Sequence, residues 1–186
     1  TREMYNINVG VVGAGWVGRH YIKLLKNFHV NVLVSDPFIT IEQANELGAK
    51  KGSLDELMAS CDIISLHAPS LSSTVKMINA SNLKLMKDGA TIINTARGSL
   101  IDETALYEEC KNGRIKACLD VSEPEPMAVD HPLRTLPNVV LTPHIAGAVT
   151  NGRLRIGTYS VLAIEGYIKG EKIPGEVTED QLGAIA

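Results

Sequence analysis

The stretch VGVVGAGWVG, residues 9–18, joins an apolar, β-branched run to a turn rich in glycine. The run Ile7–Val12 predicts a strand, and Gly13, Gly15 and Gly18 follow where that strand would pass into a helix. Glycine suits such a turn because the turn is tight, a phosphate can approach the bare backbone, and the helix can pack closely on the strand. The first N–H groups of the helix and its positive dipole end also attract anions. The stretch therefore predicts a turn that binds the phosphates of a dinucleotide.

An acidic residue stands where such a turn needs a partner. Asp36 ends the second predicted strand, Val30–Ser35, and comes 18 positions after Gly18. A carboxylate at about this distance holds the adenosine ribose in dinucleotide-binding folds. The alternative is that Asp36 only begins a turn before Pro37. An ionised Asp36 would repel a 2′-phosphate and no arginine directly follows it, so the sequence favours NAD over NADP as the cofactor.

Strand-like and helical segments alternate along the rest of the chain. Further strands are predicted at Ile63–Leu66, Ala90–Asn94, Ile115–Leu119 and Val139–Leu141. The first predicted helix has Val17, Tyr21, Leu24 and Leu25 as its apolar stripe, and the last, from about Thr150, carries Leu154, Val161, Ile164 and Ile168 on one face. Capping boxes begin the helices Ile41–Leu47 (Thr40 with Gln43) and Leu54–Ala59 (Ser53 with Glu56). A short helix is predicted over Asn82–Lys87, and a further helix is capped by Asp102 and closed by Asn112-Gly113. This alternation predicts an α/β fold with a doubly wound parallel sheet, and such sheets bind ligands beyond the carboxyl ends of their strands.

The composition is that of an ordinary globular chain. The 186 residues are 45% hydrophobic and 21% charged, and the net charge is −3, which gives no reason to expect nucleic acid or an anionic membrane as a partner. No apolar run approaches the roughly 20 residues that span a bilayer, and no secretion signal is recognisable at the start. The cysteines, Cys61, Cys110 and Cys118, lack CxxC or metal-finger spacing. We therefore expect no metal site and a reduced, cytoplasmic setting.

Four polar residues stand just after strand-like runs in the second half of the chain. Arg97 and Asp120, taken singly, are explained as a surface arginine and a helix cap. Glu125 and His144 are explained as a solvated acid and a histidine bonded to a loop carbonyl. Together they bring a cation, carboxylates and an imidazole to one edge of a nucleotide-binding sheet. That set suits the oxidation of an alcohol beside an anionic group, in which the imidazole takes the hydroxyl proton, a carboxylate favours its charged form, and the arginine binds the substrate anion.

At this point the sequence resembles a known family in four blocks, which follow one another in order from about Asn6 to Gly170. The blocks are VGVVGAGWVG…VSDP, IINTARGSLIDE, ACLDVSEPEP and NVVLTPHIAG. They are similar to those of the NAD-dependent D-isomer-specific 2-hydroxyacid dehydrogenases. The resemblance implies a Rossmann-type NAD-binding domain, hydride transfer between NAD(H) and a 2-hydroxy or 2-oxo acid, and a homodimer.

The resemblance also implies a role for each polar residue. Arg97 would bind the carboxylate and carbonyl oxygen of the substrate, His144 would be the acid/base, and Glu125 its partner. Glu125 is preferred to Glu123 because the partner acid in the family precedes the second proline of its block, and a glutamate there speaks against the branch that oxidises formate. Asp120 would hold the nicotinamide carboxamide. The residues expected at the cofactor are Gly13, Gly15, Trp16, Val17, Gly18, Asp36, His67, Ala68, Pro69, Thr95, Ala96, Arg97, Asp120, His144 and Gly147.

The same resemblance bears on domain organisation. Family members carry a second, substrate-binding domain built from chain before and after the nucleotide domain. We therefore expect residues 1–170 to be the NAD-binding domain of a larger dehydrogenase, with its final helix at about 150–169, and residues 171–186 to be a tail that leads to the other domain. The alternative is a non-catalytic NAD-binding module, such as a sensor or the corepressor relatives that keep this fold. The substrate's side-chain pocket would lie largely on the other domain, so the sequence does not separate one 2-oxo acid from another.

Overall fold

The computed structural model describes residues 3–147, 150–173 and 175–181. The chain divides into two compact units, Thr1–Pro143 and His144–Ala186. Of the expected tail, residues 174 and 182–186 lie outside the described ranges. The elements in chain order are β1 Tyr5–Val12, α1 Trp16–Leu25, β2 His29–Ser35, α2 Ile41–Glu46, β3 Lys50–Lys51, α3 Leu54–Ser60, β4 Ile63–Leu66, α4 Ala80–Leu83, β5 Thr91–Asn94, η1 Gly98–Leu100, α5 Glu103–Cys110, β6 Lys116–Leu119, η2 Pro132–Thr135, β7 Val139–Leu141, α6 Asn151–Lys169 and η3 Glu179–Gln181.

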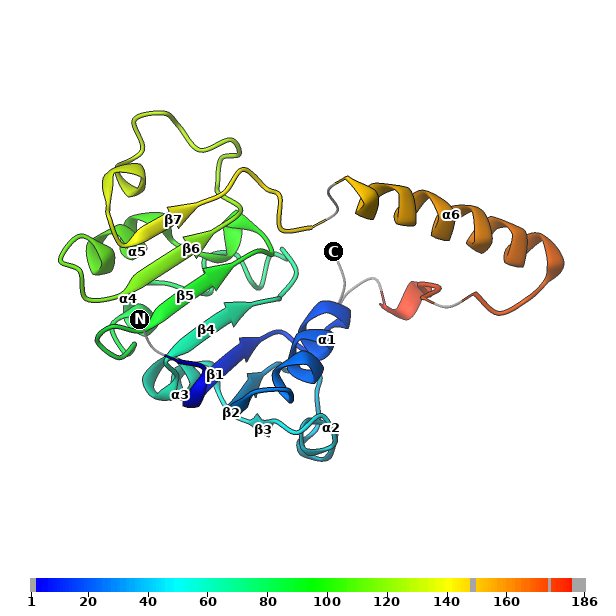
Figure 1. Ribbon diagram of the computed structural model, residues 1–186, viewed down its shortest axis with the longest axis horizontal. Helices are drawn as coiled ribbons and strands as arrows, with labels where there is room; N and C mark the ends of the chain where they lie inside the picture. The colour runs from blue at the N-terminus through cyan, green and yellow to red at the C-terminus, as the bar shows by residue number, and fades with distance from the viewer. Residues whose placement is uncertain (1–2, 148–149, 174, 182–186) are drawn as a thin grey trace. The chain divides into compact units, whose positions relative to one another are not determined.

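The first unit is built on a sheet that, over the described residues, has seven strands, all parallel, in the order β3-β2-β1-β4-β5-β6-β7 (Figure 1). The order reverses between β1 and β4, which is the switch point where parallel sheets of this kind bind ligands. The predicted α/β doubly wound fold is thereby confirmed.

Two clusters of buried apolar side chains cover the opposite faces of this sheet. Val9 and Val11 of β1 point into a cluster with α1 and α2. Val12, whose side chain points the other way because strand side chains alternate, joins a larger cluster with α3, α4 and α5. Gly10 shares that second face, where an added Cβ would lie 3.1 Å from Cys61 Sγ. The two clusters fix which side chains of each strand lie on which face of the sheet. The site candidates follow the carboxyl ends of the strands.

Several helix starts follow the local signals in the sequence. The predicted capping boxes are present: Thr40 and Gln43 open α2, and Ser53 and Glu56 open α3. Asp102 caps α5 by accepting hydrogen bonds from the N–H groups of Thr104 and Ala105. Each such cap satisfies backbone donors that have no partner within the helix, which stabilises it by about 1 kcal/mol.

The packing of α1 differs from the predicted stripe. Its buried residues are Gly18, Ile22 and Leu25, whereas Val17 and Leu24 are 67% and 51% exposed. The close approach of Gly18 to the Gly13 carbonyl, in the turn after β1, sets the rotation of the helix, so the residues four and seven positions later face inward. The stripe expected from apolar residues alone was therefore wrong at two of its positions.

Two further elements differ from expectation. The short helix expected over Asn82–Lys87 covers Ala80–Leu83 instead. It begins earlier because Asn79 caps it and forms a capping box with Asn82, and residues 84–87 lie beyond its end. The strand β3 was not predicted, since its two residues, Lys50 and Lys51, carry no apolar pattern. It lies at an edge of the sheet, where lysines are common because they disfavour pairing with another chain.

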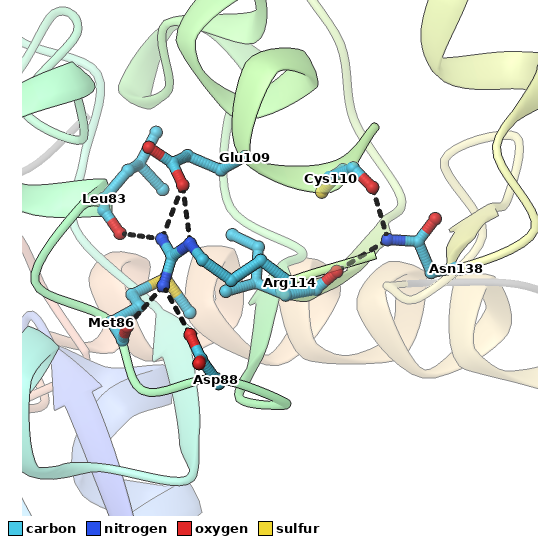
Figure 2. Close-up of polar contacts among 8 residues, drawn as sticks. Leu83, Met86, Asp88, Glu109, Cys110, Arg114 and Asn138 are labelled. Carbon is cyan, nitrogen blue, oxygen red and sulfur yellow. Dashed lines mark hydrogen bonds and ion pairs between the residues drawn. The ribbon is translucent and has the colours of Figure 1, made fainter. Parts of the chain in front are cut away.

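The amino-terminal edge of the sheet is held together by Arg114, which precedes β6 (Figure 2). Its guanidinium contacts the Glu109 carboxylate at 2.6–2.7 Å and donates to the carbonyls of Met86 and Leu83 at 2.5 and 2.8 Å. Asn138 beside it donates to the carbonyls of Cys110 and Ile115. These bonds join α4 and the turn after it to α5 and the start of β6.

In the second unit, α6 covers the residues of the long helix that the sequence predicts, and Gly170 ends it in the left-handed conformation. None of the helices in the described part of the chain is long and apolar enough to cross a membrane.

Candidate functional site

The glycine turn after β1 shows which of its glycines the fold itself requires. Gly13 has a φ of +95°, and a Cβ there would lie 2.6 Å from the backbone nitrogen of Ala68. A Cβ on Gly18 would lie 2.1 Å from the carbonyl oxygen of Gly13. At Gly15, by contrast, no heavy atom of the described residues lies within 4 Å of such a Cβ. Gly13 and Gly18 are thus needed for close packing, while Gly15 faces open space that a phosphate can approach.

The start of α1 is arranged to receive an anion. Gly15 is the N-cap residue and offers no side chain to the first N–H groups, and the first turn, which is fully described, holds no acidic residue. The side chain of Trp16 is 80% exposed beside it. Free N–H groups and the dipole of a ten-residue helix favour negative charge at this point. These features fit the pyrophosphate of NAD.

Asp36 lies next to the glycine turn and holds it in place. Its Oδ2 accepts a hydrogen bond from the Ala14 N–H at 2.7 Å. Its Oδ1 accepts from the N–H groups of Phe38 and Ile39 at 2.7 and 3.2 Å. Asp36 therefore links the ends of β1 and β2, a structural role in addition to the ribose contact that the sequence predicts. That ribose contact stays a prediction.

His67 lies beneath the same turn, directly after β4. Its backbone N–H donates to the carbonyl of Val12 at 2.7 Å. In the side chain, Nε2 lies 2.9 Å from Ser65 Oγ, and the ring centroid is 5.1 Å from that of Tyr21. Burial lowers the pKa of His67 from 6.5 to about 4, so the ring is neutral at pH 7. This environment suits a wall of the site, with Ala68 and Pro69 following it, more than a proton-transferring group.

The loop that carries Arg97 is held by a residue that the sequence did not single out. Asn94, buried at the end of β5, accepts from the Ala96 N–H at 3.0 Å and donates to the Arg97 carbonyl at 2.8 Å. The exposed Arg97 guanidinium donates to the Ala96 carbonyl at 2.7 Å. The backbone of residues 95–97 is thus fixed while the charged side chain, like that of Thr95, faces solvent.

Asp120 is the buried carboxylate of the site. It follows β6, its N–H donates to the carbonyl of Asn94 at 2.9 Å, and only 4% of its surface is exposed. The hydroxyl of Thr142, directly after β7, donates to Asp120 Oδ1. A buried carboxylate needs such a donor, because burial without a partner is costly. Thr142 thus orients the group that the sequence assigns to the nicotinamide carboxamide.

The segment after Arg97 packs directly against the loop that carries Glu125. A Cβ on Gly98 would lie 2.1 Å from the carbonyl carbon of Ser122, so only glycine fits there. Ser122 is buried, and its hydroxyl donates to the Pro124 carbonyl at 2.9 Å. Glu125 itself is exposed. Gly98 therefore places the backbones of the two predicted catalytic loops side by side at the carboxyl edge of the sheet.

His144 belongs to the second compact unit, together with Gly147. Its backbone has a φ of 55°, a conformation that is uncommon outside glycine although histidine, asparagine and aspartate adopt it more often than other residues, and its side chain is exposed. Backbone outliers of this kind concentrate at functional sites. The pairing of His144 with Glu125 stays a prediction, as do the cofactor contacts of His144 and Gly147.

The switch-point sheet, the glycine turn and the carboxylate after β2 define an NAD-binding domain of the Rossmann type. Comparison with known families agrees: residues 1–146 match the family described as D-isomer specific 2-hydroxyacid dehydrogenase, NAD binding domain. The chain belongs to the D-isomer specific 2-hydroxyacid dehydrogenases. The resemblance seen in the sequence blocks is thereby confirmed.

Individual relatives carry different activities. The chain is 41% identical to D-3-phosphoglycerate dehydrogenase of Archaeoglobus fulgidus over 90% of its own length and 32% of that protein. It is 36% identical to mitochondrial formate dehydrogenase of Solanum tuberosum, over 90% of its own length and 45% of the relative. Among solved structures, D-lactate dehydrogenase with NAD⁺ from Lactobacillus jensenii matches with a TM-score of 0.82 at 30% identity, over 96% of this chain and 58% of that one. The chain thus spans between about a third and three fifths of the length of these relatives.

Proposed function

We propose that this chain is the NAD-binding part, residues 1–170, of an oxidoreductase that transfers a hydride between NAD(H) and a 2-hydroxy or 2-oxo acid. The observation that carries the proposal is the Arg97 loop. Its backbone is fixed by the buried Asn94, its guanidinium is exposed, and Gly98 packs it against the loop of Glu125. A rigid loop that presents a charged side chain at the ligand-binding edge of a nucleotide-binding sheet is suited to hold the carboxylate of a small acid.

The roles of the residues follow from their chemistry. Arg97 binds the carboxylate and the carbonyl oxygen of the oxo acid, which holds the carbon to be reduced in place. His144 donates the proton that the new hydroxyl group requires, and Glu125 is its carboxylate partner. Bound NADH supplies the hydride. Asp120, held by Thr142, accepts a hydrogen bond from the carboxamide and so sets the orientation of the nicotinamide ring.

A substrate screen of the complete gene product tests the proposal. Oxidation of NADH is followed with a panel of 2-oxo acids that includes glyoxylate, pyruvate, hydroxypyruvate, phosphohydroxypyruvate and branched acids. We expect turnover with at least one of them, and its loss by at least about 10²-fold in His144→Gln, the usual contribution of general acid catalysis. Formate with NAD⁺ is included because a formate dehydrogenase is among the relatives, and Glu125 predicts no turnover with it.

Binding of the cofactor is measured separately, so that a failure can be interpreted. Trp16, the single tryptophan of residues 1–186, stands in the glycine turn and is exposed, so the emission of residues 1–186 should change when NADH binds. A protein that binds NADH but reduces none of the acids would favour the non-catalytic sensor over the enzyme. Unchanged Trp16 emission together with no heat on titration would contradict cofactor binding itself.

A cytoplasmic homodimer is part of the same proposal. The cysteines of the described chain are free thiols, and Cys61 and Cys110 are buried, which fits a reducing compartment. The homodimer follows from the family alone. Sedimentation of the complete gene product would test it, and a monomer at micromolar concentration would contradict it.

A further inference from the structure

The loop after β6, residues 121–131, is contacted twice by one carboxylate from another element. Glu103, the first residue of α5, accepts a hydrogen bond from the Glu123 N–H through Oε1 at 2.9 Å. Its Oε2 lies 3.2 Å from His131 Nε2. These partners are eight positions apart in the chain and lie on either side of Glu125. A single side chain therefore holds both arms of the loop that carries this acid.

The burial of Glu103 indicates that the loop, and not the helix start alone, determines its position. A glutamate that only complements a helix dipole does so from the surface. The Glu103 side chain is 12% exposed and that of His131 is 23% exposed. Burial raises the pKa of the Glu103 carboxyl, and the bond from the Glu123 N–H and the charge of His131 oppose that shift. A carboxylate in such a place needs these partners, because unpaired burial is costly.

Several further bonds of the loop are made by residues 121–135 themselves. Ser122 bonds to the Pro124 carbonyl, and the Arg134 guanidinium donates to the carbonyls of Met127 and Ala128, both at 2.8 Å. Glu103 differs from these because it belongs to the segment that begins at Arg97 and packs on Ser122 through Gly98. It therefore ties the Glu125 loop to the segment of the predicted substrate-binding arginine.

We propose that Glu103 is a positioning residue of the acid/base machinery: by holding Glu123 and His131, it fixes the backbone from which Glu125 acts, in register with the Arg97 loop. The proposal rests on the function proposed above. Loss of the clamp would let Glu125 move while the glycine turn stays intact. The turnover number should then fall and NADH affinity should not, because displacement of a catalytic group by 1 Å can cost about 10²-fold in rate.

The test uses the complete gene product and three variants. Glu103→Ala removes both contacts, whereas Glu103→Gln keeps an oxygen that can accept from the Glu123 N–H. Glu108→Ala is the matched control, because Glu108 lies on the same helix but is exposed and pairs with Lys111. For Glu103→Ala we expect kcat to fall about 10- to 100-fold, with the dissociation constant of NADH changed by less than about twofold. Glu103→Gln should recover most of kcat, and the control should match the wild type.

Hydrogen exchange of residues 121–131 gives a readout that does not depend on activity. It should be faster in Glu103→Ala and unchanged in Glu108→Ala. If Glu103→Ala does not fold, His131→Asn, which removes one contact, should show a smaller effect of the same kind. Wild-type kcat in Glu103→Ala, or equal losses of kcat and NADH affinity, would overturn the positioning role. If the wild type is active but residues 121–131 exchange equally fast in Glu103→Ala and in the wild type, the clamp alone would be overturned. A wild type without turnover would instead overturn the proposed function, and the catalytic part of this proposal with it.

Discussion

Arg97 and Arg114 stand at opposite ends of two neighbouring strands, and they differ in what their guanidinium groups do. Arg114, at the amino-terminal edge, is 25% exposed, binds the Glu109 carboxylate and donates to the carbonyls of Leu83 and Met86 (Figure 2). Arg97, at the carboxyl edge, is exposed and donates to the carbonyl of its own neighbour, Ala96. One arginine holds the fold together, and the other is held by it.

The difference lies in the side chains and not in the backbone. The loops at the carboxyl edge are also held by hydrogen bonds: Asn94 holds the Arg97 loop, and Glu103 and Ser122 hold the Glu125 loop. Their charged groups nevertheless face solvent. A fixed backbone that presents an exposed charge is what preorganised binding requires, since the ligand then has little ordering to induce. Substitutions at Arg97 and Arg114 should therefore have opposite effects on turnover and on stability.

Replacing Arg97 should affect chemistry and leave stability unchanged. For Arg97→Gln in the complete gene product we expect kcat/KM for the 2-oxo acid to fall by about 10³-fold, the loss that follows removal of one preorganised donor at a reacting group. The melting temperature and the NADH dissociation constant should stay close to wild-type values, because the Arg97 side chain is exposed and its hydrogen bond goes to the carbonyl of the preceding residue, Ala96. Steady-state kinetics and thermal unfolding measure both.

A lowered melting temperature in Arg97→Gln would break the comparison, because Arg97 would then serve the fold as Arg114 does. Wild-type turnover in the same variant would remove Arg97 from the site. Arg97→Lys sharpens the result: it keeps the charge but loses the fork of donors that fits a carboxylate, so it should recover only part of the activity.

Replacing Arg114 should have the opposite effect. Arg114→Gln leaves the Glu109 carboxylate and the carbonyls of Leu83 and Met86 without their donor, at a place where Glu109 is 15% exposed. We expect the free energy of unfolding to fall by about 2–4 kcal/mol, somewhat less than for a fully buried pair because Arg114 is partly exposed. In the fraction that is still folded, kcat should match the wild type. Chemical denaturation and kinetics on one preparation would show a contradiction if kcat fell and stability did not.

Local signals account for what the sequence predicted correctly. The glycine turn, the capping boxes of α2 and α3, and the β-branched runs each depend on residues within a few positions of one another. Arg97 and Asp120 follow the neighbouring strands β5 and β6, as the sequence predicted, while their roles in the site stay predictions. The strand β3 was missed, since Lys50 and Lys51 pair by register with β2 and carry no pattern of their own.

The supporting residues of the site were not predictable in the same way. Gly98 matters because of Ser122, Glu103 because of Glu123, and Thr142 because of Asp120. Each of these contacts joins segments at least 20 residues apart, and nothing in the local sequence marks the partner. The stripe on α1 failed for a different reason: Gly18 packs closely on the carbonyl of Gly13 in the turn before the helix, and that contact sets the rotation of the helix.

The glycine turn offers the next test, since its glycines divide in the same way as the two arginines. In Gly18→Ala the added Cβ would lie 2.1 Å from the Gly13 carbonyl oxygen, so we expect a loss of about 1–3 kcal/mol in stability and weaker NADH binding. In Gly15→Ala the Cβ meets no described atom within 4 Å and the backbone has a φ of −71°, so stability should not change. NADH binding should still weaken, because the Cβ occupies the space proposed for the pyrophosphate. Equal NADH affinity in Gly15→Ala and wild type would contradict that placement of the cofactor.

The smallest effect expected is a dependence of stability on pH that arises beneath the same turn. Burial lowers the pKa of His67 to about 4 in the folded protein, against 6.5 when it is exposed. The unfolded chain therefore binds more protons between these values, so stability is full above pH 6.5 and falls as the pH is lowered toward 4. The part due to His67 is about 1–2 kcal/mol between pH 7 and pH 5. Denaturation at both pH values should show a smaller difference in His67→Gln than in the wild type, because glutamine does not titrate. An equal difference in the two proteins would mean that His67 is protonated without cost, and hence that it is not the buried neutral wall of the site.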